Sequence, residues 1–181
     1  MHKFHPAIFL ILAGIATPSF AAEPADDLLS KIINVPAPSA IRVDGSVGKL
    51  RDDPGVQGGK ALRIDVPGKS DTSWTTAIAT PVKKPVKAGD ALVLAFWARL
   101  VKGDNGATTA TLPYNAVQLA ADPYTPLFTQ GVTIGSDWKI YEVKGKADKD
   151  YAAGTINIAI HLATGKQTID LGPIFLLNMG Q

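Results

Sequence analysis

The chain has 181 residues, of which 46% are hydrophobic and 19% are charged, so it is long enough for one domain with a hydrophobic core. Its 18 lysines and arginines nearly balance its 16 acidic residues, which argues against a surface dedicated to nucleic acid. The absence of cysteine excludes disulfides, thiolate metal sites and cysteine nucleophiles.

The first 21 residues have the pattern of a secretory signal peptide. Lys3 supplies a positive charge, residues 7–16 form an apolar run, and small residues precede a predicted cleavage site between Ala21 and Ala22. The apolar run is about half as long as a membrane-spanning helix requires, and no later stretch is long enough either. We therefore expect a periplasmic or secreted protein without a membrane span.

The rest of the chain divides into a short leading segment and one module. Residues 22–39 contain three prolines around a short apolar stretch and are predicted to form a tether or to cover the edge of a sheet. From residue 40 to residue 181, short β-forming runs alternate with glycine and proline. The predicted strands cover residues 61–66, 74–82, 91–100, 114–119, 131–134, 138–143, 155–162 and 168–177. Eight or nine strands with hardly any helix predict an all-β fold, an antiparallel β-sandwich.

Residues 155–162 alternate between apolar and polar side chains. Ile156, Ile158 and Ile160 point to one side of the predicted strand, and Asn157 and His161 point to the other. The isoleucine side is predicted to face the core, and the polar side is predicted to face solvent.

The same alternation gives other outward positions. It places Trp97 and Arg99 on the outer side of one predicted strand and Tyr114 and Gln118 on the outer side of another. Trp74 is the first residue of a third predicted strand, after a turn-like segment. A groove that binds sugars needs aromatic rings for their C–H faces and side chains that donate and accept hydrogen bonds for their hydroxyls. The candidate ligand-binding residues are therefore Trp74, Trp97, Arg99, Tyr114, Gln118, Asn157 and His161.

Several of these residues have a second, structural interpretation. Trp97 is equally consistent with a core position under a loop, and Asn157 and Gln118 are equally consistent with an ordinary surface. Trp138 favours a packing role, because it follows a Gly-Ser-Asp turn. Tyr124 lies between two prolines and either flanks the groove or stiffens a loop.

Two other classes of function stay open. A polysaccharide lyase could use His161, Tyr114 and Arg99 to abstract a proton beside a uronate carboxylate. A structural or adaptor protein of the cell envelope could keep the fold without any sugar site. A serine hydrolase and a phosphate-binding loop are disfavoured, because the Gly-x-Ser-x-Gly and Gly-x-x-x-x-Gly-Lys-Ser/Thr patterns are missing.

Three stretches together resemble carbohydrate-binding modules of families four and nine, which are galactose-binding-like β jelly rolls attached to xylanases and related glycoside hydrolases. They are the Ser-Trp pair at 73–74 with the aromatic strand at 94–99, the Gly-Ser-Asp-Trp turn and strand at 135–141, and the closing strands at 158–162 and 167–173. The resemblance implies a non-catalytic module that binds a β-linked polysaccharide of the xylan or glucan class, with a glycoside hydrolase as a possible partner.

The resemblance also implies roles for single residues. Trp74 matches a sugar-stacking tryptophan, His161 matches a hydrogen-bonding histidine, and Asp170 matches an aspartate that helps to hold a structural calcium ion. The chain departs from the pattern at Leu171, where a second acidic residue usually follows, and it lacks the family's amino-terminal Asn-Gly-Asp-Phe-Glu-like segment. Calcium requires six or more oxygen ligands, so these departures argue against a calcium site at Asp170. No other cofactor is expected.

Overall fold

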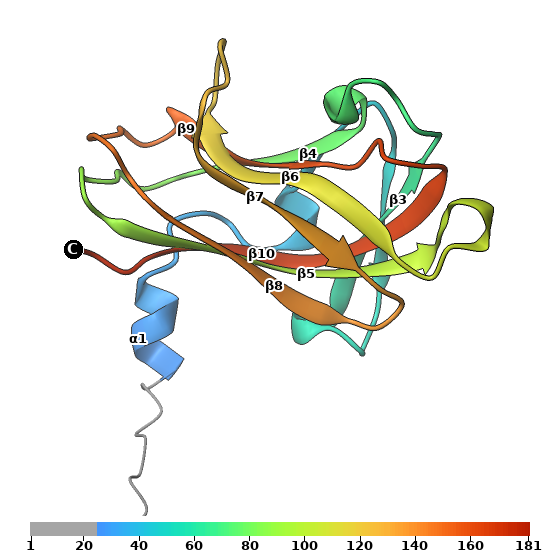
Figure 1. The fold of residues 1–181 in the computed structure, drawn as a ribbon. Coiled ribbons are helices and arrows are strands. Elements are labelled where there is room, and N and C mark those ends of the chain that lie inside the picture. Colours follow the sequence, from blue (N-terminus) through green and yellow to red (C-terminus); the bar gives the residue numbers. More distant parts are fainter. Residues whose placement is uncertain (1–24) are drawn as a thin grey trace, which may run out of the picture.

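The computed structural model describes residues 25–181, so the predicted signal peptide at residues 1–21 lies outside the described residues. The described chain forms two five-stranded antiparallel sheets packed face to face (Figure 1). This arrangement confirms the predicted all-β sandwich, with ten strands in place of the eight or nine expected. Between residues 25 and 181, no helix is both long enough and apolar enough to span a membrane.

The first sheet has the strand order β1-β4-β9-β6-β7, with bounds β1 (Arg42–Asp44), β4 (Ala77–Pro81), β9 (Ile156–His161), β6 (Ala110–Leu119) and β7 (Pro126–Ile134). The second sheet has the order β2-β3-β10-β5-β8, with bounds β2 (Gly48–Asp52), β3 (Lys60–Val66), β10 (Gln167–Asn178), β5 (Ala91–Lys102) and β8 (Lys139–Lys146). The helical elements are α1 (Ala25–Ser30) and the 3₁₀ turns η1 (Pro38–Ala40), η2 (Gln57–Gly59), η3 (Ser73–Thr75) and η4 (Asp104–Gly106).

The core lies between the two sheets and follows the predicted alternation. Ile156, Ile158 and Ile160 on β9 are fully buried, as are Leu94 and Phe96 on β5. Each such side chain contributes about 2 kcal/mol through the removal of apolar surface from water. A slip of one residue in either strand would expose this row, so the hydrophobic pattern determines which side chains face outward.

Two strands and one turn differ from the predicted elements. The strands β1 and β2 were not predicted, because edge strands this short and this exposed show no apolar alternation. Trp74 was predicted to open a strand, but it lies in the turn η3, and the strand β4 begins only at Ala77. The break expected at the Gly-Pro pair in β10 is present as a shift in register between Leu171 and Ile174.

Residues 31–36 run along the part of β10 that β3 does not reach. The backbone N–H of Ile33 donates to the carbonyl oxygen of Leu176 at 2.9 Å. The Asn34 side chain donates to the carbonyl oxygen of Ile174 at 2.8 Å and accepts from the backbone N–H of Leu176 at 2.7 Å. Asn34 also pairs with Val82, which follows β4, so this segment joins the two sheets along one edge.

Candidate functional site

The outer face of the first sheet carries a row of alanines that crosses three strands. Cross-strand register places Ala79 on β4 beside Ala159 on β9, and Ala159 beside Ala116 on β6. Arg42 on β1 continues the row at one end. Because a methyl group rises little above the sheet, Ala79 and Ala159 form the floor of a trough between longer side chains, whereas Ala116 is fully buried.

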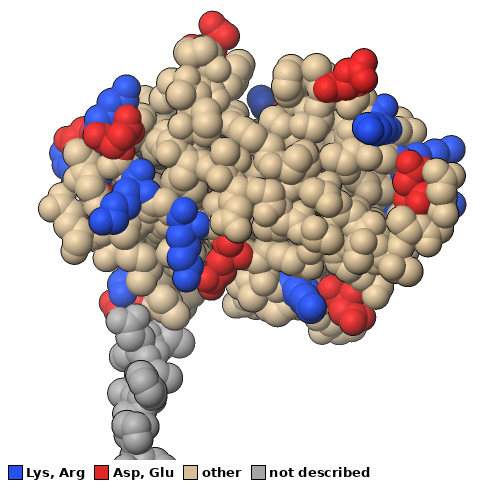
Figure 2. Space-filling model, in the orientation of Figure 1, with Lys and Arg blue, Asp and Glu red and all other residues tan. Residues whose placement is uncertain are grey.

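The trough is part of a groove with a volume of about 710 Å³. The turn η3 with Trp74 stands on one side, and the loop between β6 and β7 with Pro123 and Tyr124 stands on the other. In Figure 1 these are the green helical turn at the upper right and the loop at the top, and Figure 2 shows the hollow between the two projections. The groove therefore lies between walls formed by segments that are distant in the sequence.

Trp74 forms the most exposed aromatic surface of the groove. Its side chain is 61% exposed, and its ring meets the ring of His161 edge-on, with 6.1 Å between centroids. The turn that carries it is closed by two hydrogen bonds from Thr75, one from its backbone N–H and one from its hydroxyl, to the carbonyl oxygen of Thr72. The indole is thus presented to solvent by a closed turn and not by a strand.

His161 stands between the two aromatic residues of this wall. Its ring stacks on Tyr114 with 4.2 Å between centroids and an interplanar angle of 17°, and its Nδ1 lies 3.2 Å from the hydroxyl oxygen of Ser73. Burial lowers the pKa of His161 to about 4, so the imidazole is neutral at neutral pH. A neutral imidazole has one donor and one acceptor nitrogen, and because Nδ1 contacts Ser73, Nε2 is the nitrogen left for a sugar hydroxyl.

The other polar side chains of the groove are also oriented. The hydroxyl of Tyr114 donates to Oε1 of Gln118 at 2.8 Å, which leaves the amide NH₂ of Gln118 as a donor. Burial raises the pKa of Tyr114, so this hydroxyl stays protonated. Oδ1 of Asn157 is buried and has no hydrogen-bond partner among the described residues. Buried polar atoms are normally paired, so this acceptor marks a place where the site is incomplete.

The groove has no excess charge. Arg42 and Asp44 line its β1 end and form an ion pair with each other, with 2.9 Å between Nη2 and Oδ2. Among residues 25–181, these are the only acidic or basic side chains in its lining apart from the neutral His161. The arrangement can therefore stack on a flat apolar face and exchange hydrogen bonds with uncharged hydroxyls.

The structure separates the seven candidate residues into two groups. Trp74, Tyr114, Gln118, Asn157 and His161 all line the groove. Trp97 and Arg99 point outward as predicted, but they lie on β5 in the second sheet, so they face the opposite side of the sandwich. The seven candidates therefore do not lie in one groove, because these two are on the other sheet. Alternation indicates which side of a strand faces solvent and does not indicate which sheet the strand joins.

Trp97 and Arg99 are held by partners on the outer side of the second sheet. The indole N–H of Trp97 donates to Oε1 of Gln57 at 3.1 Å. The guanidinium of Arg99 lies 4.8 Å from the ring centroid of Trp138, which fits the packing role expected for that tryptophan. The lyase alternative required Arg99 next to His161 and Tyr114, and the structure does not assemble that trio.

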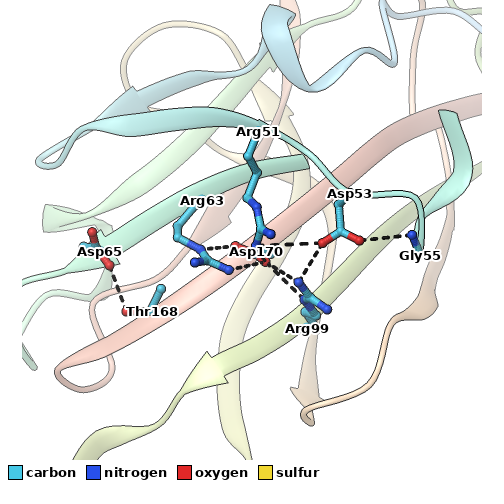
Figure 3. Close-up of polar contacts among 8 residues, drawn as sticks. All are labelled: Arg51, Asp53, Gly55, Arg63, Asp65, Arg99, Thr168 and Asp170. Atoms are coloured by element: carbon cyan, nitrogen blue, oxygen red, sulfur yellow. Dashed lines mark hydrogen bonds and ion pairs between the residues drawn. The ribbon is translucent and has the colours of Figure 1, made fainter. Parts of the chain in front are cut away.

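Arg99 belongs to an arginine cluster formed by Arg51, Arg63, Arg99, Asp53 and Asp170 (Figure 3). Asp170 on β10 has no exposed surface. Its carboxylate accepts two hydrogen bonds from Arg63 at 2.8 and 2.9 Å, two from Arg99 at 3.1 and 2.9 Å, and one from Arg51 at 3.1 Å. The three arginines come from β2, β3 and β5, so the cluster joins four strands of the second sheet.

The arginine cluster controls the charge state of Asp170. Burial alone would raise the pKa of this carboxyl group, but the hydrogen bonds and positive charges of Arg63 and Arg99 outweigh that effect and hold the pKa below its ordinary value. Asp170 is therefore ionised and paired at neutral pH.

These residues do not fit the calcium site that the resemblance implied. Calcium needs six or more oxygen ligands, whereas the surroundings of Asp170 supply guanidinium donors and positive charge. In the described part of the chain, no group of three or more histidine, aspartate or glutamate side chains could hold a metal ion. The arginines occupy the positions around the carboxylate from which a cation would be bound.

The lining residues that were not among the seven candidates include Arg42, Ser73, Tyr124 and the alanines Ala79 and Ala159. Small residues at outward positions of otherwise bulky strands are the signal that could have indicated a trough. Arg42 and Ser73 gave no such signal, because they reach the groove only through the pairing of β1 with β4 and the position of η3.

No protein-family model and no curated protein sequence matches the chain. Solved structures do. A carbohydrate-binding module CBM4 is similar with a TM-score of 0.60 and 17% identity, over 78% of this chain and 96% of the other. The second amino-terminal cellulose-binding domain of Cellulomonas fimi β-1,4-glucanase C is similar with a TM-score of 0.57 and 14% identity, over 83% of this chain and 95% of the other.

A third similar structure contains a carbohydrate-binding and a catalytic module in one chain. It holds the CBM22-1 and GH10 modules of a Clostridium thermocellum endo-1,4-β-D-xylanase with xylohexaose, and it matches with a TM-score of 0.56 and 12% identity, over 81% of this chain and 28% of that one. The chain therefore has the β-sandwich fold of jelly-roll carbohydrate-binding modules, as the resemblance to families four and nine implied.

Proposed function

We propose that this chain is a non-catalytic module that binds a neutral β-linked polysaccharide of the xylan or glucan class. The observation that carries the proposal is the groove itself, where an exposed Trp74 stands beside a floor of alanines. Its volume falls within the range of about 300–1,000 Å³ that is usual for ligand sites. The fold supports the proposal, because similar structures include cellulose-binding and xylan-binding domains.

The chemistry of the lining favours a sugar over a purely apolar ligand. The indole of Trp74 can stack on the C–H face of a pyranose ring, while His161 and the Gln118 amide can exchange hydrogen bonds with hydroxyls beside it. Because water competes for the same polar groups, each hydrogen bond contributes only about 1 kcal/mol of net binding free energy. We therefore expect a modest affinity.

The charge of the groove favours a neutral polymer over a polyuronate. Recognition of a carboxylate normally uses an arginine whose charge is not already balanced, and the charge of Arg42 is balanced by its ion pair with Asp44. Proton abstraction next to a uronate also needs a base with a pKa near the working pH. The pKa of His161, lowered by burial to about 4, makes it a weak base, which supports a binding role over lyase activity.

Partner and location follow as parts of the same proposal. The polymer is the primary partner, and a glycoside hydrolase acting on it is the protein partner, because a similar module shares a chain with a catalytic module in the Clostridium thermocellum structure. The signal-peptide pattern supports a location in the periplasm or outside the cell. A structural or adaptor role without a ligand is the competing outcome.

Titration calorimetry and affinity electrophoresis on xylan, mixed-linkage glucan, alginate and pectin test the proposal. We expect binding to a neutral polymer, a loss of about tenfold or more in affinity for Trp74→Ala, and an unchanged melting temperature. Trp97→Ala is the matched control, because it removes an outward tryptophan from the opposite face. The proposal fails if no neutral polymer binds, or if Trp97→Ala weakens binding and Trp74→Ala does not. Release of unsaturated uronates would favour the lyase.

A further inference from the structure

The turn that joins β1 to β2 lies directly against the turn that carries Trp74. Gly45 in this turn has φ of +71°, and a Cβ built on it would lie 1.7 Å from the carbonyl oxygen and 2.8 Å from the carbonyl carbon of Thr75. Real Cβ atoms essentially never come within 3.0 Å of such atoms. Any other residue at this position would therefore displace either its own turn or η3.

The turn η3 is held on its other sides as well. The backbone N–H of Ala163 donates to the carbonyl oxygen of Ser73 at 3.2 Å. The backbone N–H of Leu162 donates to the carbonyl oxygen of Thr76 at 2.8 Å. The hydroxyl of Ser73 lies 3.2 Å from Nδ1 of His161. The turn η3 is thus enclosed between the end of β9 and Gly45. A side chain added at position 45 would therefore push η3 out of its present position.

The β1–β2 turn is itself anchored to the second sheet. The hydroxyl of Ser46 donates to the backbone carbonyl oxygen of Asp65 on β3 at 2.7 Å. The carboxylate of Asp65 accepts a hydrogen bond from Thr168 on β10 at 2.8 Å (Figure 3). Gly45 therefore rests on an anchored turn, which limits how far that turn can retreat.

We propose that Gly45 is a positioning residue for Trp74. Its missing side chain allows η3 to lie close enough to the β1–β2 turn for the indole to stand edge-on to His161 at the wall of the groove. The consequence for binding rests on the proposed function, whereas the positioning itself concerns only the protein. A larger residue at position 45 moves the aromatic surface out of line with the polar groups on β9 and β6.

A second glycine distinguishes the clash of a new side chain with Thr75 from the strain of a left-handed backbone conformation. Gly59 has a similar φ of +67°, but a Cβ there would meet no atom within 4 Å. Alanine at either position carries the strain of a left-handed backbone conformation, and only alanine at position 45 also meets a neighbouring carbonyl. Gly59→Ala is therefore the matched control for Gly45→Ala.

The test combines side-chain NMR with binding. The chain has three tryptophans, so their indole N–H resonances are few and can be assigned by substitution. We expect Gly45→Ala to move the Trp74 resonance and to weaken binding to xylan or glucan by about tenfold. We expect Gly59→Ala to leave the Trp74 resonance and the affinity unchanged. An unmoved Trp74 resonance in Gly45→Ala overturns the proposal.

Further arms keep the result interpretable. If Gly45→Ala does not fold, the double variant Gly45→Ala/Ser46→Ala lets the β1–β2 turn retreat in part, and we expect a smaller shift of the Trp74 resonance, whereas no shift contradicts the proposal. If the unaltered protein binds none of the polymers and the Trp74 resonance still moves, the proposed function fails and the positioning role stands. If it binds and the resonance does not move, the positioning role fails and the proposed function stands.

Discussion

The two outer faces of the sandwich use similar residue types in opposite ways. On the first sheet, His161, Gln118 and Asn157 surround a row of alanines and keep polar atoms available beside an exposed Trp74. On the second sheet, the charged groups of the arginine cluster form ion pairs with one another around the buried Asp170. The first face has the properties of a binding surface, and the second has those of an internal cross-link between strands.

This difference shows that aromatic and charged side chains on a sheet surface do not by themselves indicate a site. Trp97 and Arg99 have the composition of a sugar contact, but their hydrogen-bonding groups already have partners in the protein. Trp74 is 61% exposed, and the groups near it are only partly satisfied. The decisive property is whether the hydrogen-bond donors and acceptors are already paired within the protein, since only unpaired groups can form hydrogen bonds with a ligand.

The largest expected effect comes from breaking the arginine cluster. Asp170→Asn keeps the shape but removes the charge that neutralises three guanidinium groups, and we expect a loss of about 3 kcal/mol in the free energy of unfolding. Urea denaturation followed by circular dichroism measures it. Asp52→Asn is the control, because Asp52 is an exposed partner of Lys60 and its removal should change little. Equal effects of the two substitutions would contradict a structural role for the cluster.

Filling the trough should affect binding and not stability. Ala159→Leu places a larger side chain on the floor of the groove, and we expect the affinity for the polymer to fall by about tenfold or more because the sugar can no longer reach the sheet. The melting temperature should change little, since the added side chain points into the groove and not into the core between the sheets. Ala153→Leu, on an exposed turn outside the lining, should leave calorimetric binding unaltered. Unchanged binding in Ala159→Leu would place the ligand elsewhere.

A smaller effect is expected from pH. Burial holds the pKa of His161 at about 4, below its usual value of 6.5, so the unfolded chain takes up this proton first as pH falls. The stability that His161 contributes is complete above pH 6.5 and is lost as the pH falls toward 4. Unfolding measured at pH 7 and at pH 4.5 should show a larger loss for the unaltered protein than for His161→Gln. The same loss in both would show that His161 does not carry the effect.

The smallest expected effect is that of calcium. Because arginines surround the Asp170 carboxylate, we expect no change in melting temperature when calcium or a chelator is added. Differential scanning calorimetry on the full chain makes the comparison. A melting temperature that rises with calcium would reveal a metal site that the arrangement around Asp170 does not explain.

Local patterns could predict much of the fold and only part of the site. The alternation along β9 correctly indicated that Ile158 is buried while Asn157 and His161 point outward, because the direction of side chains along a strand depends only on neighbouring residues. The edge strand β1, with Arg42, was not predicted, because its pairing with β4 involves a distant segment and leaves no apolar pattern.

The sequence by itself determined an all-β sandwich, the residues that form its core, and an outward set that contains Tyr114 and His161. Only the tertiary structure decided that Trp97 and Arg99 lie on the other sheet, and that Asp170 is surrounded by arginines. The physical reason is the distance along the chain between the residues that determine each feature. Which side of a strand faces the core follows from local periodicity, whereas the grouping of outward residues follows from strand order and from contacts between turns far apart along the chain.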